Sequence, residues 1–369
     1  MRSLVSSLAA LALAHCTPVV ALAASYTVID LGTLGGGASV GNGVNASGKV
    51  AGGSNLSGNG APQHAFRYDT SMHDLGTFGG SFSQGFGINA SGTETGDAFL
   101  EGDNASHAFR YDTSMHDLDT LGGTGSRGYS INASGTVAGE ADTSGVFPLH
   151  AFTYDTSMHD LGTLGGSQSG AHAINDSGVV AGYSNIDGGT SMHAFRYDTS
   201  MHDLGTLNGV SSNAFGINAA GTVTGWAALD NGTIHAFTYD TSMHDLGTLG
   251  GTFASGNAIN DSGQVAGASN TSGGDSHAFV YDSVHGMVDL NTLINPSSGW
   301  ILEHGFGINN LGQITGDGMI GEEIHAFLLT PVPEPSSLVL GSLAFAIGSG
   351  AVLWRRHRGA TSAHGIGPH

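Results

Sequence analysis

The chain has 369 residues, of which 62 are glycine and only 11% are charged. Four of its nine basic residues lie near the two ends, so five basic residues remain between them against thirty acidic ones. This balance excludes an electrostatic nucleic-acid interface, which needs clustered Lys and Arg, and the low charge argues against a helical protein rich in salt bridges.

Residues 1–24 have the pattern of an export signal. Arg2 supplies a positive charge, a mostly apolar run follows over residues 4–14, and Ala21 and Ala23 form a small-residue cleavage site. The apolar run is too short for a comfortable membrane span. The single cysteine, Cys16, lies in this segment, so cysteine chemistry is excluded from the rest of the chain.

The tripeptide His-Ala-Phe (HAF) occurs seven times after the signal. It begins at His64, His107, His150, His193, His235, His277 and His325, at intervals of 42 or 43 residues with a last interval of 48. A fixed period of this size is typical of repeat architectures. A residue that recurs in every copy is expected to serve packing before chemistry.

One repeat contains four short segments of strand length. Residues 86–90 read FGINA, a second segment ends at Gly96, HAFRY follows at 107–111, and MHDLDTL occupies 115–121. Asn-x-Ser-Gly and Asp-Thr-Ser sequences lie between these segments, and both are typical of turns. Two hairpins in about 43 residues match the size of one β-propeller blade.

The order of the landmarks predicts a closed ring over residues 25–330. The chain opens with a lone fourth strand at 26–31 and ends its repeats with a lone third strand at 325–329. Pairing these two would complete a seventh blade, whereas an open β-solenoid, the alternative, would leave both as exposed edges. We therefore predict an all-β, seven-bladed propeller of four-stranded blades, with the ring closed by the N-terminal strand.

The C-terminal segment, residues 331–358, carries three features in order. They are Val332-Pro333-Glu334-Pro335, an apolar span over 336–354, and the basic residues Arg355, Arg356 and Arg358. This order resembles the PEP-CTERM sorting signal. The resemblance implies an inner-membrane-anchored precursor, recognition by an exosortase, and release to the cell surface or an exopolysaccharide matrix. Residues 359–369 form a short tail without a recognisable motif.

The seven units themselves resemble the HAF-type extracellular repeat family. The shared sequence pattern is HAFRYD-TSMHDLGTLGG together with the IN-x-SG and VAG stretches. The resemblance covers about 300 residues. The family is recognised by its repeat, so the resemblance implies a secreted repeat protein and supplies no catalytic residues.

Each HAF histidine is expected to pack between blades and to hydrogen-bond a neighbouring backbone group, because one imidazole per blade cannot make a tight metal site. The Asp of each Asp-Leu (D-L) pair, such as Asp74, is expected to accept a turn or inter-strand hydrogen bond. The Gly-rich run at 123–128 matches a nucleotide-binding motif in sequence only, since it is predicted to be a loop with no helix after it. The run YSNIDGG at 183–189 offers oxygens to Ca²⁺ but reads first as a turn, so we predict no cofactor and leave Ca²⁺ open.

The departures from the repeat are interpreted first as adaptation of the last blade to a joint made by the two chain ends, and the alternative is that they bind a ligand. Trp226 and Trp300 are candidates for stacking on a sugar ring. The favoured hypothesis is a non-catalytic binding or structural propeller whose partner is exopolysaccharide or a surface protein. The alternative is a glycosidase or lyase, for which Glu303, Asp317, Glu322 and Glu323 are candidates by location only.

Overall fold

The computed structural model describes residues 25–58, 62–144, 149–186 and 191–332. The predicted signal with Ala21 and Ala23, and the sorting residues Pro333, Glu334, Pro335, Arg355, Arg356 and Arg358, therefore lie outside the described residues. Within the described residues, no helix has the length and apolar character that a membrane span requires.

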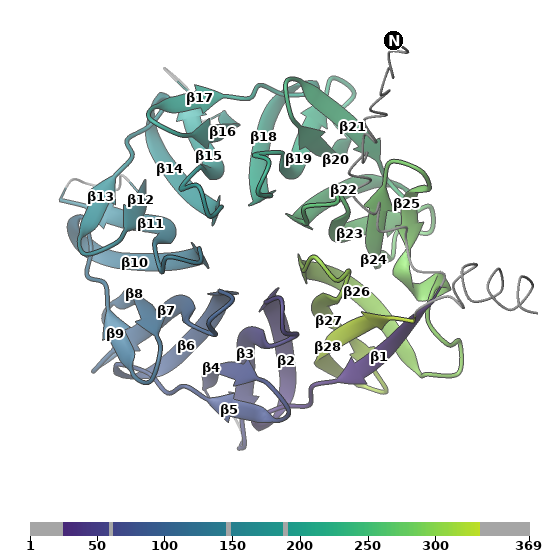
Figure 1. The fold of residues 1–369 in the computed structure, drawn as a ribbon, viewed down its shortest axis with the longest axis horizontal. Helices are drawn as coiled ribbons and strands as arrows, with labels where there is room; N and C mark the ends of the chain where they lie inside the picture. Colours follow the sequence, from purple (N-terminus) through teal and green to yellow (C-terminus); the bar gives the residue numbers. More distant parts are fainter. Residues whose placement is uncertain (1–24, 59–61, 145–148, 187–190, 333–369) are drawn as a thin grey trace, which may run out of the picture.

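Seven four-stranded sheets surround a central space (Figure 1). The first holds β2 (Gly35–Val44), β3 (Val50–Leu56), β4 (Gln63–Tyr68) and β5 (Met72–Asp74). The second holds β6 (Gly79–Ile88), β7 (Glu94–Leu100), β8 (Ser106–Tyr111) and β9 (Met115–Asp117). The third holds β10 (Gly122–Ile131), β11 (Val137–Thr143), β12 (Leu149–Tyr154) and β13 (Met158–Asp160). The fourth holds β14 (Gly165–Ile174), β15 (Val180–Ile186), β16 (Met192–Tyr197) and β17 (Met201–Asp203).

The remaining sheets follow the same plan. The fifth holds β18 (Asn208–Ile217), β19 (Val223–Leu229), β20 (Ile234–Tyr239) and β21 (Met243–Gly247). The sixth holds β22 (Gly250–Ile259), β23 (Val265–Thr271), β24 (Ser276–Asp282) and β25 (Gly286–Asp289), and a 3-10 turn at Leu290–Thr292 follows it. The seventh holds β26 (Trp300–Ile308), β27 (Ile314–Ile320), β28 (Glu323–Pro331) and the N-terminal β1 (Tyr26–Asp30).

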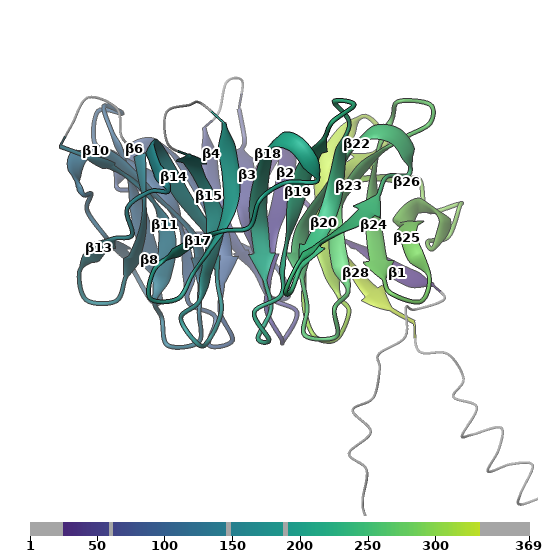
Figure 2. The same cartoon turned by 90° about the horizontal axis from the view of Figure 1, so that it is seen from above.

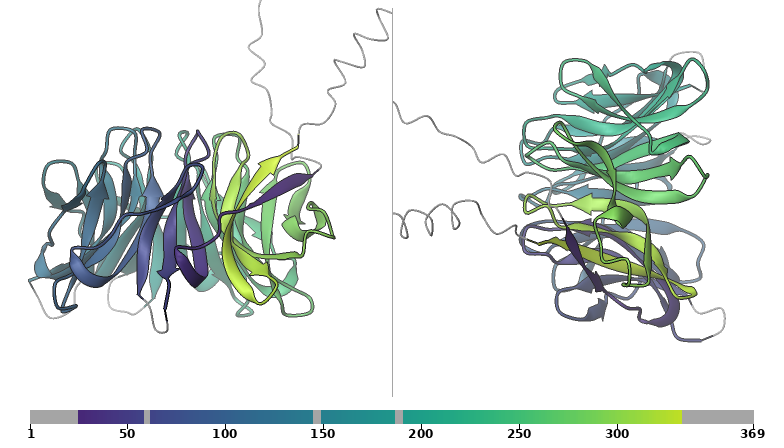
Figure 3. Two further views of the ribbon diagram at one scale, coloured as in Figure 1. Left: turned by 90° about the horizontal axis from the view of Figure 1, so that it is seen from below. Right: turned by 90° about the vertical axis from the view of Figure 1, so that its right-hand side faces the viewer.

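The prediction of an all-β propeller built from four-stranded blades is confirmed. In each blade the first strand lies next to the central space and the fourth at the rim, and the strands run through the thickness of the disc (Figures 1 and 2). β1 pairs antiparallel with β28, with Tyr26 opposite Pro331 and Asp30 opposite Phe327. Figure 3 shows these two strands side by side.

The three letters of HAF have three different structural roles, shown here by the first copy. The Phe66 ring is fully buried in the blade core. Ala65 is also fully buried, and its backbone N–H donates to the Ser83 hydroxyl oxygen of the next blade at 2.8 Å. The His64 Nδ1–H donates to the Asp74 carboxylate at 2.8 Å, where we expected a backbone acceptor. Core packing therefore requires the Phe, contact with the next blade requires the Ala, and pairing with the fourth strand requires the His.

The glycine of each VAG stretch is required by the backbone carbonyl of the first strand beside it, and in five blades the phenylalanine ring is also too close for a Cβ. A Cβ on Gly52 would lie 2.0 Å from the Val40 carbonyl oxygen and 2.7 Å from the Phe66 ring. The equivalent position is glycine in all seven blades, at Gly52, Gly96, Gly139, Gly182, Gly225, Gly267 and Gly316. The Phe and Gly of the repeat are therefore one packing unit.

A belt of seven asparagines joins the blades around the axis. The Nδ2 of each donates to the backbone carbonyl of the next, at distances from 2.8 to 3.3 Å, through Asn45, Asn89, Asn132, Asn175, Asn218, Asn260 and Asn309. The seventh bond runs from Asn309 back to Asn45. The Oδ1 of the same residue accepts a backbone N–H of its own hairpin turn, as between Asn89 and Thr93 at 3.0 Å. Each side chain thus fixes a turn and docks a neighbouring blade.

We predict that Asn89→Asp lowers the free energy of unfolding by about 1–3 kcal/mol. The new carboxylate keeps the acceptors for the turn but loses the donor to the Asn132 carbonyl. The matched control is Asn295→Asp, an exposed residue whose Oδ1 accepts the Ser297 N–H at 2.9 Å, and it should change stability by less than about 0.5 kcal/mol. Urea denaturation of both variants measures this, and equal shifts would contradict the role of the belt.

Candidate functional site

The inner strands of the seven blades each direct one side chain toward the central channel at the same position. These residues, here named the collar, are Asn42, Phe86, Tyr129, His172, Phe215, Asn257 and Phe306. Each stands three residues before a belt asparagine, so the same turn that builds the belt also sets the collar. Five of the seven collar residues carry a ring.

The collar lies between two spaces in the channel. On one side is a cavity of about 630 Å³, the wide cavity, which Trp226, Phe253, Ser255, Ala268 and His304 also line. On the other side is a cavity of about 200 Å³, lined by the collar and by apolar side chains such as Ile88, Ile131 and Ile217. The channel is therefore broad and aromatic at one end and narrow and aliphatic at the other.

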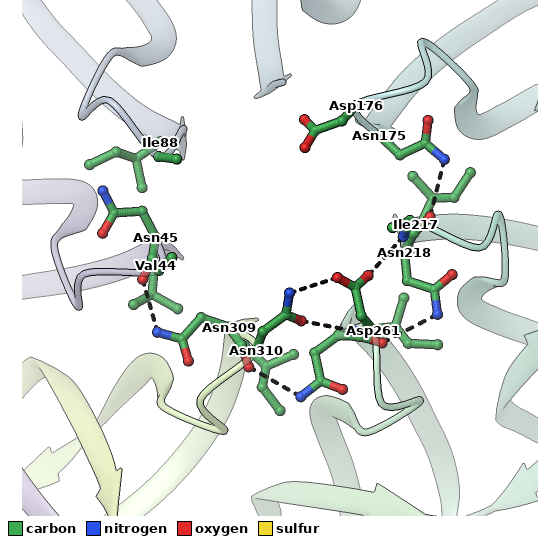
Figure 4. A pocket seen from close by; sticks show the side chains of 16 residues that line it. Val44, Asn45, Ile88, Asn175, Asp176, Ile217, Asn218, Asp261, Asn309 and Asn310 are labelled. Carbon is green, nitrogen blue, oxygen red and sulfur yellow. Dashed lines mark hydrogen bonds between the residues drawn. The ribbon is translucent and has the colours of Figure 1, made fainter. Parts of the chain in front are cut away.

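The narrow end opens through the belt at a polar mouth (Figure 4). Asp176 and Asp261 lie here, and each accepts a backbone N–H from the preceding blade, that of Ala133 at 2.8 Å and of Ala219 at 2.9 Å. Asn310 donates to the second oxygen of Asp261 at 2.6 Å. These carboxylates are engaged in joining blades.

The collar rings are held in place by contacts with one another. His172 stacks on Phe215, with centroids 4.9 Å apart and planes at 14°, and meets Tyr129 edge-on at 4.9 Å. The His172 Nδ1–H donates to the Ala214 carbonyl at 2.9 Å. Burial lowers the pKa of His172 below its usual 6.5, so at neutral pH this member of the collar is uncharged.

Sequence differences between repeats occur at paired positions on the two inner strands of each blade, and four members of these pairs, Trp226, Ser255, Ala268 and His304, line the wide cavity. Opposite one another on the first and second strands stand the variable pairs Val40/Gly53, Gln84/Asp97, Arg127/Glu140, Gly170/Tyr183, Asn213/Trp226, Ser255/Ala268 and His304/Asp317. The Phe, Gly and Asn that build the fold are the same in all seven blades. The variable pairs and the collar therefore distinguish one blade from another.

One variable pair carries an internal charge network. The Glu140 carboxylate accepts hydrogen bonds from the hydroxyls of Tyr129 at 2.8 Å and Tyr183 at 3.2 Å. Arg127 lies 3.6 Å from Glu140 and 3.5 Å from Asp97. Burial raises the pKa of Asp97, and Arg127 opposes that shift. The charges of this network are directed at one another, and they fix the Tyr129 ring in the collar.

A second variable pair, His304 and Asp317, lies beside Glu303 and forms the described group that most resembles a metal or acid–base site. His304 Nδ1 lies 2.8 Å from an Asp317 oxygen, and Glu303 offers a third ligand atom within 4.8 Å of both. The hydrogen bond to Asp317 is the main reason that the pKa of His304 is raised. The group is half-buried, and its histidine faces the wide cavity.

The structure separates the candidates chosen from the sequence. Trp226 lines the wide cavity, whereas Trp300 meets the fully buried Phe327 edge-on at 6.1 Å in the core of the last blade. Glu322 and Glu323 lie at the exposed hairpin between β27 and β28, where Glu323 contacts His325 at 3.2 Å. Only Glu303 and Asp317 of the four candidate acids come together.

Three other predicted features are placed as follows. Residues 123–128 form part of β10, where a loop was expected, and Arg127 enters the charge network. Residues 183–186 of the YSNIDGG run belong to β15, and 187–189 lie outside the described residues. The Asp of each D-L pair accepts hydrogen bonds as expected, shown by Asp74, which binds His64 and the Gly76 N–H.

The collar was missed in the analysis of the sequence, although a signal for it was present. Aligning the seven copies shows Asn, Phe, Tyr, His, Phe, Asn and Phe at one position between nearly constant neighbours. Sequence alone gives no reason to place that position on the channel axis. The position reaches the axis only because the inner strands of the seven blades pack around the channel.

No protein-family model and no curated protein matches the chain. Solved structures of low similarity include TolB from Acinetobacter baumannii, with 12% identity and a TM-score of 0.43 over 78% of this chain and 81% of that one. A puromycin-hydrolysing peptidase from Mycobacterium tuberculosis has 12% identity and a TM-score of 0.46 over 80% and 52%. The six-bladed lectin from Aleuria aurantia has 12% identity and a TM-score of 0.38 over 72% and 100%.

A buried carboxylate breaks the repeat in the core. Glu94 occupies a position that is Val in five blades and Ile in the seventh, and it is fully buried. Neither of its oxygens has a hydrogen-bond partner among the described residues, and Arg67 lies 3.8 Å away. Burial raises the pKa of Glu94 well above 4.5, although Arg67 and Lys49 oppose the shift.

We predict that Glu94→Val stabilises the protein by about 1–3 kcal/mol at pH 7. A raised folded-state pKa means that native stability falls as pH rises above the unfolded value of about 4.3 toward the folded one. The gain from Glu94→Val should therefore be smallest near pH 4 and grow toward pH 7. Urea unfolding at both pH values tests this, with the exposed Glu101→Val as control. A loss of stability at pH 7 would show that attraction to Arg67 outweighs the cost of burial.

Proposed function

We propose that this chain is an exported, non-catalytic binding propeller of the cell surface or exopolysaccharide matrix, and that its ligand binds in the wide cavity. The observation that carries the proposal is the distribution of differences between repeats. Positions that build the blades are constant, whereas the collar and the four variable-pair residues that line the wide cavity differ from blade to blade. Packing of identical blades alone would not require different side chains at these channel-facing positions.

The proposal includes the delivery route and the closed ring. The resemblance to a PEP-CTERM signal at Val332–Pro335 supports processing by an exosortase, with transient anchoring in the inner membrane through residues 336–354. The pairing of β1 with β28 and the bond from Asn309 to Asn45 support a ring closed by the chain's own ends. A closed ring would keep the cavity walls fixed relative to one another, which favours binding without reorganisation.

A hydrolytic or lyase activity is the competing function, and His304 with Glu303 and Asp317 is the observation that favours it. The two functions differ in a direct assay. The purified full chain is incubated with exopolysaccharide from its host, with and without Ca²⁺, and retained polymer and newly formed chain ends are both quantified. We expect retention without new reducing or unsaturated ends.

Matched variants locate the binding in that assay. Phe215→Ala removes a collar ring and should lower retention about tenfold. Phe99→Ala removes a ring that packs on Phe82 away from the cavity, with centroids 5.5 Å apart, and should leave retention unchanged. New chain ends that disappear in Asp317→Asn would establish an enzyme, and retention that is equal in both variants would place binding elsewhere.

A further inference from the structure

We infer that the wide cavity recognises an uncharged pyranose sugar, inserted as the terminal unit of a glycan with one ring against the collar. This inference rests on the proposed function and specifies the ligand class for the same site. It is carried by three features of the cavity wall, namely its rings, its lack of unpaired charge and its amide groups.

The rings give the cavity a preference for flat, apolar faces. Phe86, Phe215 and Phe306 contribute side chains from three blades, and Trp226 adds the largest one. A pyranose presents C–H groups on its ring faces and hydroxyls around its edge. Aromatic faces bury the former while the edge remains available for hydrogen bonds. Because the rings come from different blades around the axis, a bound sugar would meet walls on several sides.

The cavity wall offers no unpaired charge. No Lys, Arg, Asp or Glu is among the described residues that line it, and His304, which does, is paired with the Asp317 carboxylate. Arg127, behind the wall, lies against Asp97 and Glu140. A uronate or sulfated sugar would therefore enter without an unpaired cation in the wall to compensate its desolvation, and a cationic ligand without a carboxylate in the wall. The wall favours a neutral ligand over either.

Amide groups supply the polar part of the wall. The Nδ2 groups of Asn42 and Asn257 donate to backbone carbonyls of the next blade, at 2.7 and 3.0 Å, which fixes both side chains. The Ser255 hydroxyl donates to the Asn257 Oδ1 at 2.9 Å, and both residues line the cavity. Oriented amide oxygens are suitable acceptors for sugar hydroxyls.

The shape of the channel favours entry by the end of a glycan. The wide cavity, about 630 Å³, is within the range of small-ligand sites. Beyond the collar the space falls to about 200 Å³ and its wall becomes aliphatic. A polymer threaded through the channel would place its hydroxyls against that wall. A terminal sugar that stops at the collar avoids this cost.

The test is a binding titration of the full chain with defined small probes. The neutral probes are the methyl glycosides of glucose, galactose, mannose and fucose, and the charged probes are methyl glucuronide and tetramethylammonium. Saturation-transfer NMR detects binding, and tryptophan fluorescence reports on Trp226. We expect at least one neutral glycoside to bind, and methyl glucuronide and tetramethylammonium to bind about tenfold more weakly or not at all.

Variants tie the signal to the cavity. Phe215→Ala and Trp226→Ala should each weaken the neutral glycoside about tenfold, with Phe306→Leu as a milder alternative if either fails to fold. Phe99→Ala should have no effect. The unfolding transition of each variant is measured to confirm that it is folded.

The outcomes separate this inference from the proposed function. Preferential binding of glucuronide or tetramethylammonium that is lost in Phe215→Ala would overturn the neutral-sugar inference and leave a binding propeller standing. Neutral binding that is unaffected by Phe215→Ala and Trp226→Ala would overturn the location. If no neutral glycoside binds, the inference is wrong, and the polymer-retention assay then decides the proposed function independently.

Discussion

The hydrogen-bonded belt of asparagines is the constraint on which the rest of the molecule depends. Each Nδ2 crosses to the next blade while the Oδ1 of the same side chain fixes its own turn, as Asn45 does with Asn89 and Lys49. One residue type thereby sets both the hairpin and the angle between blades. Because the collar stands three residues upstream, the belt also fixes the channel wall. An amide serves here because it offers a donor and an acceptor at once.

The molecule separates the residues that build it from those that distinguish its blades. The Phe of HAF, the Gly opposite it and the belt Asn are constant because a clash, a void or an unpaired polar group would follow any change. The collar and four members of the variable pairs line the channel space, and the repeat exchanges side chains at these positions. Glu94 is the exception, a departure inside the core with no ligand-facing role among its described contacts. Repetition therefore supplies rigidity, and the departures at the channel supply the candidate recognition surface.

Much of the fold could be predicted from the sequence, because the period, the turns and the alternation of apolar residues act locally. The seven copies of the repeat predicted the number of blades, and the lone strands at the two ends predicted how the ring would close. The site could not be predicted in the same way, since it is assembled from seven segments that meet only around the axis. Trp226 and Trp300 looked equivalent as departures from the repeat, yet one lines the cavity and the other packs on Phe327. The partner of each HAF histidine was also missed, because His64 and Asp74 face each other only after β4 and β5 pair.

The central claim is that constant positions form the scaffold while the varied positions around the channel bind the ligand. A crystal structure of the protein soaked with a neutral oligosaccharide ending in the sugar selected by titration tests it most directly. The account predicts density for the terminal sugar in the wide cavity, stacked on collar rings and in contact with Trp226, with the belt unchanged. Density on the outer rim, at the His–Asp pairs of the HAF repeats, or at the narrow mouth beside Asp261 would contradict it.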